Sequence, residues 1–87
     1  MNIELQQVES SQIHAIGHDA QTNTLAVRFK RYSGEPSSLY HYGNFTAEEF
    51  AAFKAAESIG KHFGAHIKPF ADKYPFKRIE SMPGVAA

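Results

Sequence analysis

The sequence predicts a small α+β domain, in which a three-stranded antiparallel β-meander is followed by two α-helices packed on one face. Its 87 residues, 43% of them hydrophobic, are enough for one hydrophobic core but not for two domains. A segment of alternating apolar residues indicates a strand, and a helix-capping pattern after it indicates that the helices follow the strands. Strands followed by helices are typical of the α+β class.

The first two strands are expected in "IHAIGHD" and "TLAVRFK", on either side of the turn-rich "DAQTN". In the second segment Leu25, Val27 and Phe29 share one face, while the residues between them share the other. One face of this strand should therefore pack on the core and the other should meet water. The short polar connection predicts an antiparallel hairpin.

A loop and a third strand follow. "SGEPSS" holds a glycine and a proline among serines, and we expect it to be an exposed loop. In the third strand, "LYHYGNF", Tyr40 and Tyr42 lie two residues apart, so their rings should be neighbours on one face. Leu39 and His41 should point to the other face.

Two helices are predicted after the strands. Thr46 followed by Glu49 is a capping-box pattern that begins the first, which should run to about Glu57. The apolar stripe of the second, Ile59, Phe63 and Ile67, is out of phase with the first, so a break is expected with Ser58 as the new N-cap. Pro69 should end the second helix.

The predicted core combines the apolar faces of the second strand and of both helices. Its members are Leu25, Val27, Phe29, Phe50, Phe53, Ile59 and Phe63. The later segment offers Phe70, Tyr74, Phe76 and Ile79 as further anchors.

Charge and hydropathy exclude some classes of protein. Lys and Arg together number nine, as do Asp and Glu, so bulk charge does not favour a protein that coats nucleic acid without specificity. The positive charge is concentrated in residues 59–78, with five basic residues against one acid. No run approaches the roughly 20 apolar residues that cross a bilayer. We expect a soluble cytoplasmic protein without a membrane partner.

Several segments, taken in order, resemble the KTSC family. They are Ile16-Gly17-x-Asp19, the central Tyr40-x-Tyr42 and Ser58-x-Gly60-x-x-Phe63, within about residues 8–74. The family is named for a domain at the C-terminus of some lysyl-tRNA synthetases and also occurs alone in bacterial and phage proteins. The resemblance implies a small α+β unit, and the synthetase context suggests RNA binding. On this basis residues 1–7 form an N-terminal extension, 8–79 the domain and 80–87 a flexible tail.

The sequence departs from the family pattern at two places. "KRYSGEPSS" is several residues longer than the usual glycine turn before the tyrosine strand. Phe45-Thr46 stands where Val-Pro is common, and threonine can cap the helix that proline would start.

The sequence does not predict an enzyme. His62 and His66 have the i, i+4 spacing at which two imidazoles can share a metal, but no third ligand is evident. Two solvent-facing histidines are the simpler expectation, so neither a metal site nor a cofactor is predicted. No nucleophile motif or phosphate loop is present.

We therefore expect a non-catalytic binding module. Tyr40 and Tyr42 should serve mostly as packing residues, with a stacking surface for bases as the alternative. If the ligand is nucleic acid, the candidate contact residues are Tyr40, Tyr42, Arg28, Lys30, Lys61, Lys68 and Lys73. The partner would be RNA or a nucleic-acid-associated protein. A protein-interaction or inhibitor module that binds no nucleic acid remains the other hypothesis, and the oligomeric state is left open.

Overall fold

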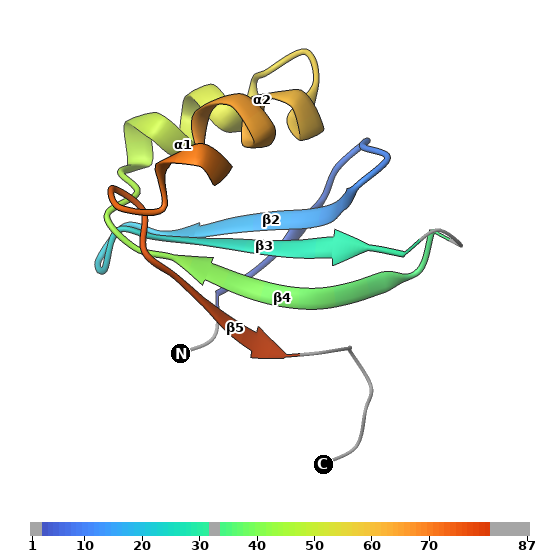
Figure 1. Ribbon diagram of the computed structural model, residues 1–87, viewed down its shortest axis with the longest axis horizontal. Helices are drawn as coiled ribbons and strands as arrows, with labels where there is room; N and C mark the ends of the chain where they lie inside the picture. Colours follow the sequence, from blue (N-terminus) through green and yellow to red (C-terminus); the bar gives the residue numbers. More distant parts are fainter. Residues whose placement is uncertain (1–2, 32–33, 81–87) are drawn as a thin grey trace.

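The computed structural model describes residues 3–31 and 34–80, which form a five-stranded antiparallel sheet with helices on one face (Figure 1). The strands follow their chain order across the sheet: β1 (Gln6–Gln7), β2 (Ile13–Asp19), β3 (Thr24–Lys30), β4 (Pro36–Tyr42) and β5 (Phe76–Glu80). The helices are α1 (Ala47–Lys54), α2 (Ile59–His66) and the short 3₁₀ helix η1 (Lys68–Phe70). The α+β class and the two helices are confirmed.

The expected count of three strands is wrong, because two edge strands extend the meander. β1 pairs with β2 through only two residues, Gln6 opposite Ile16 and Gln7 opposite Ala15. β5 pairs with β4, with Phe76 opposite Tyr42. Neither added strand has an apolar alternation that sequence analysis could detect, since two glutamines and a run of exposed residues carry no such signal.

The boundaries differ from expectation at several points. β4 begins at Pro36, inside the segment predicted as a loop, and proline is accepted at the first residue of a strand. α1 ends at Lys54 rather than near Glu57, and α2 ends at His66, before Pro69. Residues 6–7, placed in the N-terminal extension, belong to the sheet. The predicted flexible tail lies outside the described residues, apart from Glu80 at the end of β5.

The core lies between the helices and the central strands. Five of its predicted members, Leu25, Val27, Phe53, Ile59 and Phe63, are buried, whereas Phe29 and Phe50 are half-buried against it. The core also takes in Ile13, Ile16, Tyr42, Phe45, Ile67 and Tyr74. Ala26, expected on the wet face of β3, is fully buried between its strand neighbours Gly17 and His41.

The helices begin where the sequence predicts. Thr46 accepts a hydrogen bond from the Glu49 N–H, and the Glu49 carboxylate accepts one from the Thr46 N–H, which completes the capping box. Ser58 caps α2 by accepting from the Lys61 N–H. Among the described residues, no helix has both the length and the apolar character that crossing a bilayer requires.

Glu49 also joins the start of α1 to the segment before β5. Its second carboxylate oxygen accepts a hydrogen bond from the Tyr74 hydroxyl and lies 3.4 Å from Lys73 Nζ. Partial burial raises the pKa of Glu49, but hydrogen bonds from Thr46, Tyr74 and Lys73 outweigh it, and the net pKa lies below the usual value.

Gly17 marks a close approach of two backbone segments. A Cβ atom at this position would overlap the carbonyl oxygen of Glu4 and lie 3.1 Å from Cγ2 of Ile3. The N-terminal segment therefore crosses β2 in direct contact with its backbone, and only glycine leaves the space.

Replacing Gly17 with alanine should displace the residues before β1 and destabilise the protein by about 1–3 kcal/mol, the usual cost of overpacking. Gly64→Ala is the matched control. It lies in α2 with no heavy atom within 4 Å of the added Cβ, so it should stabilise by up to about 1 kcal/mol. Urea unfolding of the two variants measures both effects, and equal midpoints for Gly17→Ala and the natural protein would contradict the close approach.

Glu49→Gln should lower the melting temperature at pH 7 and have less effect near pH 3. The pKa of Glu49 in the folded protein is depressed below 4.5, its value in the unfolded chain. The ionised carboxylate therefore stabilises the fold fully above the unfolded-state pKa, and this stabilisation is lost as the pH falls through the folded-state pKa. Thermal unfolding of both proteins across this range measures the difference. If the melting temperature of Glu49→Gln stays below that of the natural protein by the same amount down to pH 3, the charge of Glu49 is not the cause of the difference.

Candidate ligand-binding groove

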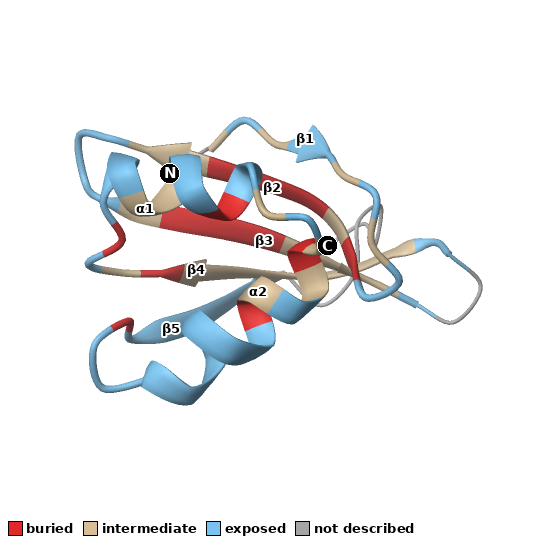
Figure 2. Cartoon of the chain, turned by 90° about the horizontal axis from the view of Figure 1, so that it is seen from above, coloured by how far each residue is buried: buried red, intermediate tan, exposed pale blue. Residues whose placement is uncertain are grey.

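The side of the sheet that faces the helices becomes more exposed from β2 to β5. Ile16 on β2 and Val27 on β3 are 1% and 0% exposed, and Tyr42 on β4 is 6% exposed. Tyr40 is half-buried, and Phe76 on β5 is 56% exposed. Figure 2 shows this change as the buried strands β2 and β3 give way to the exposed β5. The aromatic side chains of β4 and β5 thus lie at the open edge of the core.

A groove of about 550 Å³ lies between this part of the sheet and α2. Tyr40, Tyr42 and Phe76 form its floor, with ring centroids 5.8–6.4 Å apart in each pair. Phe63 of α2 and Phe29 of β3 meet the tyrosines edge to face, at 5.6 and 5.5 Å. The remaining lining residues are Gln12, Ser38, Gly64 and Lys68. We call this surface the aromatic groove.

The aromatic groove continues into a second hollow of about 640 Å³, lined by Ser11, Gln12, Phe29, Lys30 and Arg31. Gln12 and Phe29 line both, so the two hollows adjoin, and together they are called the depression. Basic residues stand at its two ends, Lys68 at one and Lys30 with Arg31 at the other. No acidic residue is among the described side chains that line it, so the depression suits an anionic ligand.

The floor itself is uncharged. Burial, followed by the neighbouring Tyr40, raises the pKa of Tyr42 to about 12. Tyr42 therefore keeps its hydroxyl proton at physiological pH. A planar apolar group can rest on this floor without meeting an anion.

Four of the candidate contact residues line this depression. Tyr40 and Tyr42 are neighbours on one face, as predicted, and the expectation that they are mainly packing residues is confirmed for Tyr42. Tyr40 packs against the core but keeps part of its ring exposed. Lys68 is exposed at one end, and Lys30 lies at the other, where its Nζ donates to the Ser10 carbonyl at 2.5 Å.

The other three candidates lie elsewhere. Arg28 stands opposite Leu39 in the sheet register, on the face away from Tyr40, and its Nη1 donates to the Ser37 carbonyl at 3.0 Å. Lys61 is exposed in the first turn of α2 and does not line the groove. Lys73 pairs with Glu49 and lies over the Tyr74 ring, 5.1 Å from its centroid.

Phe76 lines the aromatic groove but was not predicted to do so. It was expected to be a buried anchor, as were Phe70 and Ile79, but the three are 56%, 49% and 40% exposed. Only Tyr74 of that set is buried. Phe76 stands opposite Tyr42, and Arg78 opposite Tyr40, so both share the face of the aromatic groove. The one feature of the sequence that could have indicated a binding role for Phe76 is its position in a basic segment, next to Lys77 and Arg78.

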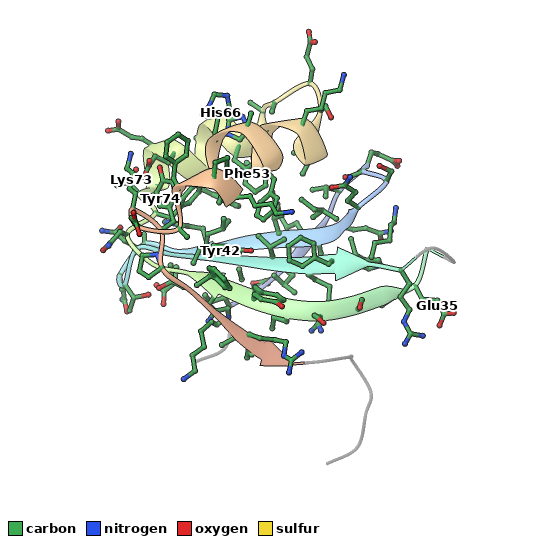
Figure 3. The ribbon with its side chains drawn as sticks, viewed as in Figure 1. Glu35, Tyr42, Phe53, His66, Lys73 and Tyr74 are labelled. Carbon is green, nitrogen blue, oxygen red and sulfur yellow. The ribbon has the colours of Figure 1, made fainter. Side chains whose placement is uncertain are left out.

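A second, separate cavity of about 320 Å³ lies on the other side of α2. Its lining includes Glu49, His62, His66, Lys73 and Tyr74. Figure 3 shows Lys73 and Tyr74 together at the end of the molecule away from Glu35. The His62 ring stacks on buried Phe53 at 5.2 Å rather than facing solvent freely. Burial, and then the charge of His66, lowers the pKa of His62.

The segments that resemble a known family have clear structural roles. Gly17 allows the close approach of the N-terminal segment, and Ser58 caps α2. A Cβ at Gly60 would lie 3.3 Å from Ser10 Oγ, so α2 begins close to the connection before β2. Phe63 joins the core to the aromatic groove.

Comparisons with known proteins agree with these features. The KTSC domain model matches residues 9–74. An uncharacterised protein of Stutzerimonas stutzeri (strain A1501) is 33% identical over 73 residues, which are 84% of this chain and 93% of that protein. The crystal structure of a KTSC domain protein from Yersinia pestis aligns with a TM-score of 0.74 and 29% identity, covering 91% of this chain and all of that one. The chain therefore belongs to the KTSC family.

Proposed function

We propose that this protein is a non-catalytic module that binds single-stranded RNA in the aromatic groove. The observation that carries the proposal is the combination of an aromatic floor with basic residues at both ends and no acidic lining residue. Single-stranded RNA presents planar bases and a negative backbone, which match these two parts of the surface.

Stacking supplies most of the expected affinity. Phe76 and the exposed part of Tyr40 offer ring faces, and a base stacked on such a ring contributes about 1–3 kcal/mol. The net charge of the chain is zero, so the chain as a whole does not attract phosphate. Contacts between RNA phosphates and the lining residues Lys68 and Lys30 would add to the affinity from stacking. The aromatic floor favours a single strand over a duplex, because only unpaired bases are free to stack on it.

The groove supports binding better than catalysis. Its titratable lining residues are tyrosines, lysines and an arginine, with no histidine or carboxylate among the described side chains to act as a general base near pH 7.

A protein partner is the second candidate, and the position of β5 at an edge of the described sheet favours it. β5 is the last strand in the sheet order, and Phe76 and Ile79 on it are exposed. An extended peptide can add to such an edge by main-chain hydrogen bonds. Lys77 and Arg78 on the same strand would favour an acidic peptide.

Phe76→Ala should weaken binding to single-stranded RNA by about 5- to 150-fold, because it removes a stacking face worth about 1–3 kcal/mol. Phe76 is mostly exposed, so the variant should fold normally. Fluorescence anisotropy with a labelled oligonucleotide at low salt measures the change. Phe70→Ala, which removes a similarly exposed phenylalanine outside the groove, is the matched control and should bind like the natural protein.

Among the lysines, Lys68→Gln should weaken binding to every RNA sequence. It should also reduce the slope of log affinity against log salt concentration by about 0.7, the value for one phosphate contact with a single strand. Lys61→Gln and Lys73→Gln should have little effect, since neither residue lines the groove. His66→Gln should likewise leave RNA binding unchanged, since His66 lines the separate cavity. Loss of binding in Lys73→Gln but not in Lys68→Gln would place the RNA site elsewhere, and no binding at low salt would favour the protein partner.

A further inference from the structure

A pair of histidines outside the aromatic groove has the arrangement of a metal chelate. His62 and His66 lie one turn apart on α2, and their ring centroids are 4.7 Å apart with an angle of 42° between the rings. Both line the 320 Å³ cavity on the far side of α2 from the groove. The i, i+4 spacing is the one at which helical histidines share a zinc ion in metalloproteases.

The ring separation fits coordination to one ion. A metal–nitrogen bond of about 2.0–2.1 Å puts the centroid of a ligating imidazole about 3.2 Å from the metal. Two such ligands at an angle of about 90–109° have centroids about 4.5–5.2 Å apart. The observed 4.7 Å lies within this range.

One of the two ligands is already held in place. The His62 ring stacks on Phe53 at 5.2 Å and 26°, and Phe53 is fully buried. His66 is exposed, so its side chain can adjust when an ion binds. A partly preorganised pair loses less entropy on binding than two mobile side chains.

The described residues supply no third ligand. No group of three His, Cys, Asp or Glu side chains suited to a metal is found among them. Glu49 lines the same cavity, but its oxygens already accept hydrogen bonds from the Thr46 N–H and the Tyr74 hydroxyl, and its charge is offset by Lys73. Water would occupy the remaining positions around an ion held by the two rings.

We propose that His62 and His66 form a two-histidine chelate for a late first-row transition metal ion. Imidazole ligands suit copper, nickel and zinc, and the usual order of affinities places Cu²⁺ first. Mg²⁺, which prefers oxygen ligands, is excluded by the same chemistry.

The test is calorimetric titration of the full, untagged chain with CuCl₂, ZnCl₂ and MgCl₂. One Cu²⁺ should bind per chain, Zn²⁺ should bind more weakly, and Mg²⁺ should give no binding heat. His66→Gln should weaken Cu²⁺ binding by about 10–100-fold or more, since losing a ligand costs at least as much as losing a supporting partner. His14→Gln, which changes a histidine of β2 outside the cavity, is the matched control and should bind as the natural protein does.

A second measurement needs no variant. In NMR spectra of the natural protein, Zn²⁺ should shift the ring resonances of His62 and His66 together, with saturation, and leave those of the other histidines unchanged. Unchanged ring resonances at saturating Zn²⁺ would overturn the proposal. So would natural Cu²⁺ affinity in His66→Gln, or an equal loss of affinity in His14→Gln.

Discussion

The position of a small helical layer on the sheet determines where this protein has a core and where it has a surface. Each main helix has eight residues and is therefore about 12 Å long, so the helical layer is small. The helices pack on β2 and β3, and β5 runs away from them (Figure 1). Tyr40 on β4 and Phe76 on β5 therefore remain partly exposed.

Helix α2 separates two surfaces of different chemistry. Phe63 and Gly64 face the aromatic groove, while His62 and His66 face the smaller cavity. The groove has an uncharged floor and basic ends, and the cavity holds a carboxylate, a lysine and two imidazoles. Because neighbouring residues of one helix serve the two surfaces, single substitutions in α2 can alter one surface without removing the other.

The elements with strong local patterns could be predicted from the sequence. The alternation of Leu25 and Val27 identified β3, and Thr46 with Glu49 and Ser58 identified the helix starts, because these features depend on neighbouring residues alone. β1 and β5 could not be predicted in this way. They are edge strands whose residues are mostly exposed, so their pairing depends on the sheet that is already formed. Phe45 was missed for a similar reason, since it is buried from a loop without periodicity.

The candidate site was predictable only in part. The spacing of Tyr40 and Tyr42 placed both rings on one face, and this holds in the structure. Arg28 was expected beside them, but the register of β3 and β4 sets it opposite Leu39, on the other face. That register, which shifts at a bulge between Arg28 and Lys30, is not specified by a local pattern. Phe76 completes the floor only because β5 pairs with β4.

The most direct measurement of the central claim is a map of RNA contacts on the protein. The ¹⁵N-labelled chain would be titrated with a short single-stranded RNA at low salt, and the amide resonances followed by NMR. If RNA binds in the aromatic groove, saturable shifts are expected at Tyr40, Gly64 and Phe76, which border it. The amides of His66 and Lys73, around the separate cavity, should stay in place. Saturable shifts confined to the cavity side, or none at millimolar RNA, would contradict the assignment of the groove as an RNA-binding surface.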